Sequence, residues 1–257
     1  MGGRLASRMP TPRPKPPPPT LVLLVRHAVT PTTGQVLPGR AKGLHLADTG
    51  RAQAETAAAR IAEWLEVVTA SAARPRVNAG DHPSAARRPA SRRRGPQRPR
   101  VAAVYASPLE RTRETAAPIA RALGLSVVPE RGLLECDFGA WTGSALKDLS
   151  KLPEWTAVQR YPSGFTFPGG ESFAGMQARM IETVNGLCQR HHGEAVVAVS
   201  HADPIKALVA DALGAHLDLF QRIVVSPCSV TAISYATAGP TVLAVNSTGS
   251  LGELRPS

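Results

Sequence analysis

The sequence predicts an α/β protein built on a mostly parallel sheet. Three apolar runs, at residues 21–25, 101–106 and 196–200, are continuous rather than alternating, which is typical of strands buried on both faces. Segments with helical periodicity lie between these runs, so strands and helices alternate along the chain. The 257 residues, 43% of them hydrophobic, are enough for one domain with a sizeable core.

The first half of the chain supplies two strand-to-helix units. After the first strand and a loop, an amphipathic pattern at residues 49–68 predicts a helix. The second strand runs into Ser107 and Pro108, where we expect Ser107 to cap a helix and Pro108 to occupy its first position. That second helix should cover residues 111–123, with an interruption at Pro118.

The second half of the chain repeats this alternation. Residues 169–172 predict a turn and the start of a third helix. After the third strand, Asp203 and Pro204 are expected to cap and open a fourth helix. Two final strands are expected at residues 224–235 and 241–245. The apolar face of the third helix carries Phe173, Met176, Met180, Val184 and Leu187.

Basic and imidazole side chains follow three of these strands at the point where each should end. Arg26 and His27 follow the first strand, Arg111 lies shortly after the second, and His201 directly follows the third. The carboxyl ends of parallel strands meet at one edge of a sheet, where ligands bind in open α/β folds. A helix N-terminus at a strand end adds free backbone N–H groups that favour an anion. We therefore expect these four side chains to converge on an anion-binding site.

Five short motifs follow one another along the chain. They are Leu-Val-Arg26-His27-Ala, Ser107-Pro108-Leu-Glu-Arg111-Thr-Arg-Glu-Thr115-Ala116, Leu134-Glu135-Cys-Asp-Phe138-Gly139-Ala-Trp141-Thr-Gly143, Gly169-Gly170-Glu171-Ser172 and Val199-Ser200-His201. Together they resemble the histidine phosphatase superfamily, also called phosphoglycerate mutase-like, over about residues 20–68 and 101–250. The resemblance implies a three-layer αβα sandwich around the mostly parallel sheet. Within the superfamily the chain looks most like a group of actinobacterial proteins classed as phosphomutases.

The resemblance implies a role for each polar residue of the expected site. His27 would be the nucleophile that becomes a phosphohistidine. Arg26, Arg111 and His201 would hold the phosphoryl oxygens. Thr33 stands where many relatives have an Asn, and its hydroxyl can still bond a phosphate oxygen. Two guanidinium groups and an imidazole can position and neutralise a phosphoryl group, so no metal and no cofactor are expected.

A carboxyl group is expected to protonate the departing alcohol. The resemblance implies Glu135 for this role, and nearby bulky apolar residues such as Phe138 and Trp141 could raise its pKa to suit. Asp137 is the alternative, since it is acidic and only two residues away. In an extended loop the two carboxyl groups would point to opposite sides, so only one could face the phosphate.

The segment at residues 144–167 helps to distinguish a phosphatase, which hydrolyses the phosphoenzyme, from a mutase, which returns the phosphoryl group to the substrate. Mutases of the superfamily have a longer segment here with adjacent arginines, whereas this chain has Lys147, Lys151 and Arg160 and no such pair. Residues 28–29, Ala-Val, also replace the usual Gly-Glu after the nucleophile. The expected function is a metal-independent phosphomonoesterase acting on a small phosphorylated metabolite. The alternatives are a phosphomutase, or a non-catalytic binder of phospholigands or nucleic acid.

The net charge of +11 comes from two segments rich in proline and arginine. Residues 1–20 and 71–100 hold the whole basic excess and half of the 24 prolines. Because the remainder is nearly neutral, a nucleic-acid partner is not expected. We expect a single domain at residues 20–250, a disordered tail at 1–19, a disordered insertion at 69–100, and a further tail at 251–257.

Three scattered cysteines, Cys136, Cys188 and Cys228, suggest a reducing compartment rather than a disulfide framework or a zinc site. We expect Cys136, beside Glu135, to be a small packed residue. No apolar segment reaches transmembrane length, so a membrane partner is not expected and the cytoplasm is the expected location. A phosphorylated small molecule is the expected partner, and a homodimer stays open.

Overall fold

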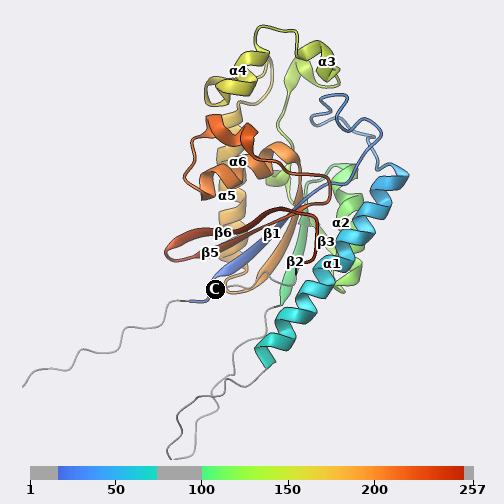
Figure 1. Cartoon of the computed structure of the whole chain (residues 1–257), viewed down its shortest axis with the longest axis vertical. Helices are drawn as coiled ribbons and strands as arrows, with labels where there is room; N and C mark the ends of the chain where they lie inside the picture. Colours follow the sequence, from blue (N-terminus) through green and yellow to red (C-terminus); the bar gives the residue numbers. More distant parts are fainter. Residues whose placement is uncertain (1–16, 74–99, 252–257) are drawn as a thin grey trace, which may run out of the picture.

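The computed structural model describes residues 17–73 and 100–251 (Figure 1). Most of the predicted tail at 1–19, of the predicted insertion at 69–100 and of the predicted tail at 251–257 lies outside the described residues. The predicted start of the insertion at residue 69 was wrong, because residues 69–73 still belong to the first helix.

A six-stranded mixed sheet forms the centre of the structure, in the order β3-β2-β4-β1-β5-β6. The pairs β1–β4, β2–β4 and β2–β3 are parallel, whereas β1–β5 and β5–β6 are antiparallel. The predicted mostly parallel sheet is therefore confirmed. The strands are β1 (Thr20–Arg26), β2 (Val101–Ala106), β3 (Val127–Pro129), β4 (Ala195–Ser200), β5 (Val230–Ala236) and β6 (Gly239–Ser247).

Helices cover both faces of the sheet, which confirms the αβα sandwich (Figure 1). On one face lie α1 (Asp48–Ala73) and α2 (Glu110–Ala122), and on the other α5 (Phe173–Arg190) and α6 (Ala202–Ala212). Strand β1 shows why its apolar run is continuous: Leu23 packs with the first helix pair and Leu24 with the second. Burying such a side chain contributes about 1.5–3 kcal/mol, so both faces of β1 stabilise the fold.

A third apolar cluster lies beyond the sheet, under a lid at residues 144–167. The lid contains two short helices, α3 (Leu146–Leu149) and α4 (Trp155–Arg160), which lie together at the top of Figure 1. Two of its aromatic rings, Phe165 and Phe167, pack edge to face with 5.0 Å between centroids. Short 3-10 turns complete the structure at η1 (Arg131–Leu133), η2 (Gly139–Trp141), η3 (Pro162–Gly164) and η4 (Leu217–Arg222).

Two predicted helix starts were wrong by one or two residues. Helix α2 begins at Glu110 after Leu109, and the Ser107 side chain makes no capping bond. The N-cap residue of helix α6 is His201, so Asp203 lies inside the first turn rather than before it. The Ser107 hydroxyl instead contacts His201 Nε2, and the Asp203 carboxylate pairs with Lys206 one turn later.

Two further predictions were wrong, one about a helix break and one about a strand start. Helix α2 continues through Pro118 without a break, because the proline is buried in a helix already held by packing on the sheet. The strand predicted from residue 224 begins only at Val230. Before it the chain turns at Cys228, whose φ of 56° is left-handed, so residues 224–229 cannot extend the strand.

Candidate active site

The sheet brings the three predicted strand ends together. Arg26 at the end of β1 lies opposite Ser200 at the end of β4, and β2 flanks β4 on its other side. The ring centroids of His27 and His201 are 5.2 Å apart, and Arg111 Nη2 lies 3.3 Å from His201 Nδ1. The expected convergence of the basic and imidazole groups is thus what the fold produces.

The His27 ring is held with one nitrogen free to react. Its Nδ1 lies 2.8 Å from the Ala28 carbonyl oxygen, which can only accept, so Nδ1 carries the proton and Nε2 keeps its lone pair. Burial, with the charges of Arg111 and Arg26, lowers the pKa of His27 to about 3. The ring is therefore neutral at physiological pH, as a nucleophile requires.

Two guanidinium groups beside His27, one fully buried and one partly buried, have unused N–H groups. Arg111 is fully buried and donates from Nη2 to the Gly39 carbonyl oxygen at 2.7 Å, while its Nε and Nη1 have no partner among the described residues. Arg26 donates from Nη1 to the Val225 carbonyl oxygen at 2.6 Å, and its Nε is likewise unpartnered. Unpaired buried charges are costly, and this donor set fits the oxygens of a phosphoryl group.

His201 is fully buried between the two basic strand ends. Its Nε2 lies 2.9 Å from Ser107 Oγ. Because a guanidinium can only donate, His201 Nδ1 accepts from Arg111 and Nε2 carries the proton toward Ser107. Burial, followed by the charges of Arg111 and the nearby His27, holds the pKa of His201 well below its ordinary value. Ser107, expected to cap a helix, instead orients this imidazole.

The two candidate acids lie in different surroundings. Glu135 is 7% exposed and lines the pocket around His27, with Oε2 3.9 Å from His201 Nδ1. The side chain of Asp137 is 43% exposed and faces Arg40 at 3.5 Å, away from the lining of the pocket. Of these two carboxyl groups, Glu135 is the one placed to reach a group bound at His27.

The environment of Glu135 favours its protonated form. Burial and the charge of Asp203 raise the pKa of Glu135 to about 7, against the Cys136 N–H and the charges of Arg111 and Arg26. Such a carboxyl can both give and take a proton near neutral pH. Cys136 itself is buried in the aromatic cluster, in the packed position that was expected.

Thr33 also lines the pocket. Its Oγ1 accepts from the Thr30 N–H at 2.9 Å and lies 2.9 Å from Thr30 Oγ1. The hydroxyl is thus engaged with Thr30 in the loop after β1. A contact from Thr33 to phosphate stays a prediction.

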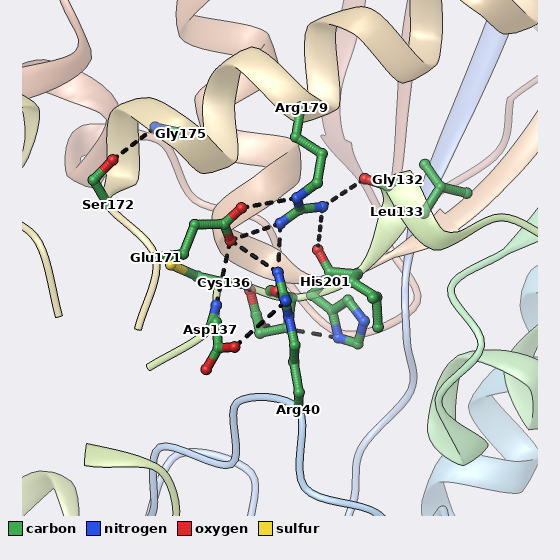
Figure 2. A network of polar contacts seen from close by, with 12 residues as sticks. Arg40, Gly132, Leu133, Cys136, Asp137, Glu171, Ser172, Gly175, Arg179 and His201 are labelled. Carbon is green, nitrogen blue, oxygen red and sulfur yellow. Dashed lines mark hydrogen bonds and ion pairs between the residues drawn. The ribbon is translucent and has the colours of Figure 1, made fainter. Parts of the chain in front are cut away.

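A partly buried ion network holds the segment that carries Glu135, and sequence reasoning missed it (Figure 2). Arg40 Nε donates to the Glu135 carbonyl oxygen at 2.9 Å, and its Nη2 contacts Glu171 Oε2 at 3.0 Å. Arg179 donates two hydrogen bonds to the Glu171 carboxylate, from Nε to Oε1 and from Nη2 to Oε2, both at 2.9 Å. It also donates from Nη1 to the carbonyl oxygens of Gly132 at 2.6 Å and Leu134 at 3.0 Å. The available signal was Arg179 itself, a cation at the edge of the apolar stripe of a predicted helix.

The pocket at His27 has a volume of about 300 Å³. Arg26, His27, Thr30 and Glu135 line its reactive end. The rest is lined mainly by apolar and aromatic side chains from the lid and from the loop after β1. The apolar lining residues are Val36, Leu37, Pro38, Phe138, Leu146, Trp155, Val158, Phe167, Phe173 and Ala202.

Within residues 17–73 and 100–251, no group of three or more His, Cys, Asp or Glu side chains is arranged to hold a metal ion. Among the helices of the same residues, none is both long and apolar enough to cross a membrane.

The fold and this pocket define an α/β protein with a site fitted to a phosphoryl group. The chain belongs to the histidine phosphatase superfamily: the family model of its branch 1 matches residues 86–248. The predicted family is therefore confirmed.

Two curated relatives illustrate the similarity. A phosphoserine phosphatase of Hydrogenobacter thermophilus is 34% identical over 152 residues, which cover 58% of this chain and 72% of the relative. The bifunctional protein Rv2228c of Mycobacterium tuberculosis is 37% identical over 153 residues, which cover 59% of this chain. The match spans only 42% of the length of that mycobacterial protein.

Solved structures share the fold at low identity. A mycobacterial glucosyl-3-phosphoglycerate phosphatase superposes with a TM-score of 0.67 at 21% identity, over 89% of this chain and 99% of the other. A phosphoserine phosphatase from Entamoeba histolytica, solved with phosphoserine, gives a TM-score of 0.68 at 20% identity, over 91% and 100%. These likenesses confirm the architecture of the sandwich.

Proposed function

We propose that this chain is a metal-independent phosphomonoesterase that acts on a small phosphorylated metabolite through a phosphohistidine at His27. The observation that carries the proposal is a neutral, buried imidazole beside unpartnered guanidinium donors. His27 keeps the lone pair of Nε2, while Arg26 and Arg111 present buried N–H groups that lack partners. A bound phosphoryl group would supply the oxygens for those donors and the phosphorus for His27.

The first half of the reaction transfers the phosphoryl group to the enzyme. The Nε2 lone pair of His27 attacks phosphorus as the bond to the alcohol oxygen breaks. Glu135, protonated at its raised pKa of about 7, gives its proton to the departing oxygen. Arg26 and Arg111 neutralise the charge on the phosphoryl oxygens throughout. His201, engaged by Arg111 and Ser107, would orient the Arg111 guanidinium, and direct contacts from His201 and Thr33 to the phosphoryl oxygens stay predictions.

The second half returns the enzyme to its starting state. The Glu135 carboxylate takes a proton from water as the water oxygen attacks the phosphohistidine. The bond between phosphorus and Nε2 breaks, inorganic phosphate forms, and the electron pair returns to His27. Glu135 is again protonated, so protons and electrons balance over the cycle.

Hydrolysis is favoured over mutase transfer by the composition of the pocket wall. The lid cations Lys147, Lys151 and Arg160 are exposed, and none of them is among the described side chains that line the pocket. A bisphosphate would find few charges to retain it. The named phosphatases among the relatives and structural neighbours also support hydrolysis. A probable phosphoglycerate mutase of Klebsiella pneumoniae, 31% identical over 135 residues, keeps the mutase as the alternative.

Trapping of the phosphoenzyme tests the proposal. The protein is mixed rapidly with p-nitrophenyl phosphate, denatured, and assayed for protein-bound phosphate that is labile in acid and stable in base. We expect the label in wild type and none in His27→Ala, with turnover unchanged by chelator. Turnover abolished by chelator, or label that persists in His27→Ala, would overturn the proposal. The mutase alternative predicts phosphate transfer between positions of one substrate, whereas we expect free phosphate.

The cytoplasmic location stays a prediction. The homodimer stays open, and binding of a phospholigand or nucleic acid through the basic segment stays an alternative. The basic segment falls almost wholly outside the described residues.

A further inference from the structure

Beyond the reactive end, the pocket has two walls of different chemistry. One is apolar and comes from the lid and the loop after β1. It includes Leu37, Leu146, Val158 and Trp155, the last stacked on Trp141 at 6.4 Å between ring centroids. A leaving group that fills this part of the pocket must therefore lay a face against hydrocarbon and aromatic surface.

The other wall is polar and is built by α6 and η4. It presents Asp203 and Lys206, one turn apart on α6, together with Gln221. Lys206 Nζ lies 3.2 Å from Asp203 Oδ1 and 3.2 Å from Gln221 Oε1. The side chains of Lys206 and Asp203 are only 16% and 18% exposed, so the pair is fixed and largely shielded from water.

The charges of the pocket balance without any contribution from the leaving group. With Glu135 protonated, the charged side chains that line the pocket are Arg26, Lys206 and Asp203, and Arg111 adds a further cation beside His201. A phosphomonoester dianion neutralises the two guanidinium groups, and Asp203 neutralises Lys206. A carboxylate or second phosphate on the leaving group would add an excess anion to the half-buried site, and an ammonium would add an excess cation.

We infer that the leaving alcohol of the substrate is uncharged and has an apolar face, and that Asp203 sets this preference by neutralising Lys206. The inference rests on the proposed phosphomonoesterase function and adds the class of substrate. Asp203 is then a specificity-determining residue. Without its carboxylate, the neighbouring Lys206 on α6 would attract anionic leaving groups.

Two matched esters measure the preference in wild-type enzyme. Phenyl phosphate and 4-carboxyphenyl phosphate differ by one carboxylate and have similar leaving groups, so the ratio of their kcat/KM values reports charge discrimination. We expect phenyl phosphate to be favoured by about tenfold or more, within the range that one pocket contact supplies. The ratio is measured well below the Glu135 pKa of about 7, because an ionised Glu135 would itself repel the carboxylated ester more than phenyl phosphate.

Two variants shift this ratio in opposite directions if the pair works as inferred. Asp203→Asn leaves Lys206 unneutralised and should improve the relative use of the carboxylated ester by about tenfold. Lys206→Met leaves Asp203 unneutralised and should worsen it. Asp48→Asn is the control, because Asp48 also pairs with a base three residues later in the first turn of a helix but does not line the pocket. Its ratio should equal that of wild type.

The outcomes separate the inference from the proposed function. A wild type that favours the carboxylated ester, or two variants that shift the ratio in the same direction, overturns the inference while the phosphohistidine at His27 still forms. Turnover of both esters that survives in His27→Ala overturns the proposed function itself.

Discussion

Arg179 and Glu171 form a two-point ion pair, with both guanidinium-to-carboxylate distances at 2.9 Å (Figure 2). The same guanidinium holds the carbonyl oxygens of Gly132 and Leu134, and Arg40 joins Glu171 to the Glu135 carbonyl oxygen. Glu171 therefore fixes two arginines that together position the backbone at Glu135.

Removing the Glu171 charge should weaken both the fold and the reaction. In Glu171→Gln two partly buried guanidinium groups lose their shared anion, and we expect the free energy of unfolding to fall by about 1–3 kcal/mol. Because the Glu135 backbone loses its support, kcat should fall more than KM changes. Thermal melts and steady-state kinetics measure the two effects. A variant with wild-type kcat would contradict the positioning role.

The two candidate acids are separated by a pair of conservative variants. Glu135→Gln removes the proton donor and should reduce kcat by about 10²–10⁴-fold with alkyl phosphates. The loss should be smaller with p-nitrophenyl phosphate, whose leaving group departs without a proton. Asp137→Asn is the matched control and should retain most of the activity. A larger loss in Asp137→Asn than in Glu135→Gln would reverse the assignment.

The raised pKa of Glu135 predicts a pH limb in the first step. Glu135 acts as an acid in phosphoryl transfer to His27, so the single-turnover rate should fall above pH of about 7 as the carboxyl ionises. Asp203→Asn removes one of the charges that raise this pKa, so the limb should move to lower pH. A limb that is unchanged in Glu135→Gln would show that another group titrates.

The lowered pKa of His27 predicts a loss of stability in acid. Below pH 6.5 the unfolded chain binds a proton at His27, whereas the folded chain resists until pH of about 3. The unfolded state thus binds more protons in this window, and stability falls as pH falls through it. Chemical denaturation at pH 7 and pH 4 should show a smaller difference for His27→Gln than for wild type. His192→Gln, at an exposed position, should behave as wild type.

The sequence was sufficient where a feature depends on residues close together in the chain. The apolar runs of β1, β2 and β4 and the polar residues after them are local patterns, and parallel pairing brings those ends together. Arg26, His27, Arg111 and His201 could be predicted as neighbours for this reason.

Features that depend on contacts between distant segments were not predictable in the same way. The bond from Arg40 to Glu171 joins residues 131 apart in the sequence, and no local pattern specifies it. Ser107 looked like a helix cap because its local sequence fits one, but the partner of its hydroxyl, His201, lies 94 residues away. Likewise the choice between Glu135 and Asp137 depends on which way a loop faces in the folded chain.

The proposed phosphohistidine at His27 is tested directly by finding which imidazole nitrogen carries the phosphoryl group. Because Nδ1 is held by the Ala28 carbonyl oxygen, only Nε2 is free to attack phosphorus. Phosphorus NMR of the trapped phosphoenzyme, with peptide mapping by mass spectrometry, distinguishes the two phosphohistidine isomers and locates the residue. We expect a phosphate on Nε2 of His27. A phosphate on Nδ1, or on any other residue, would contradict it.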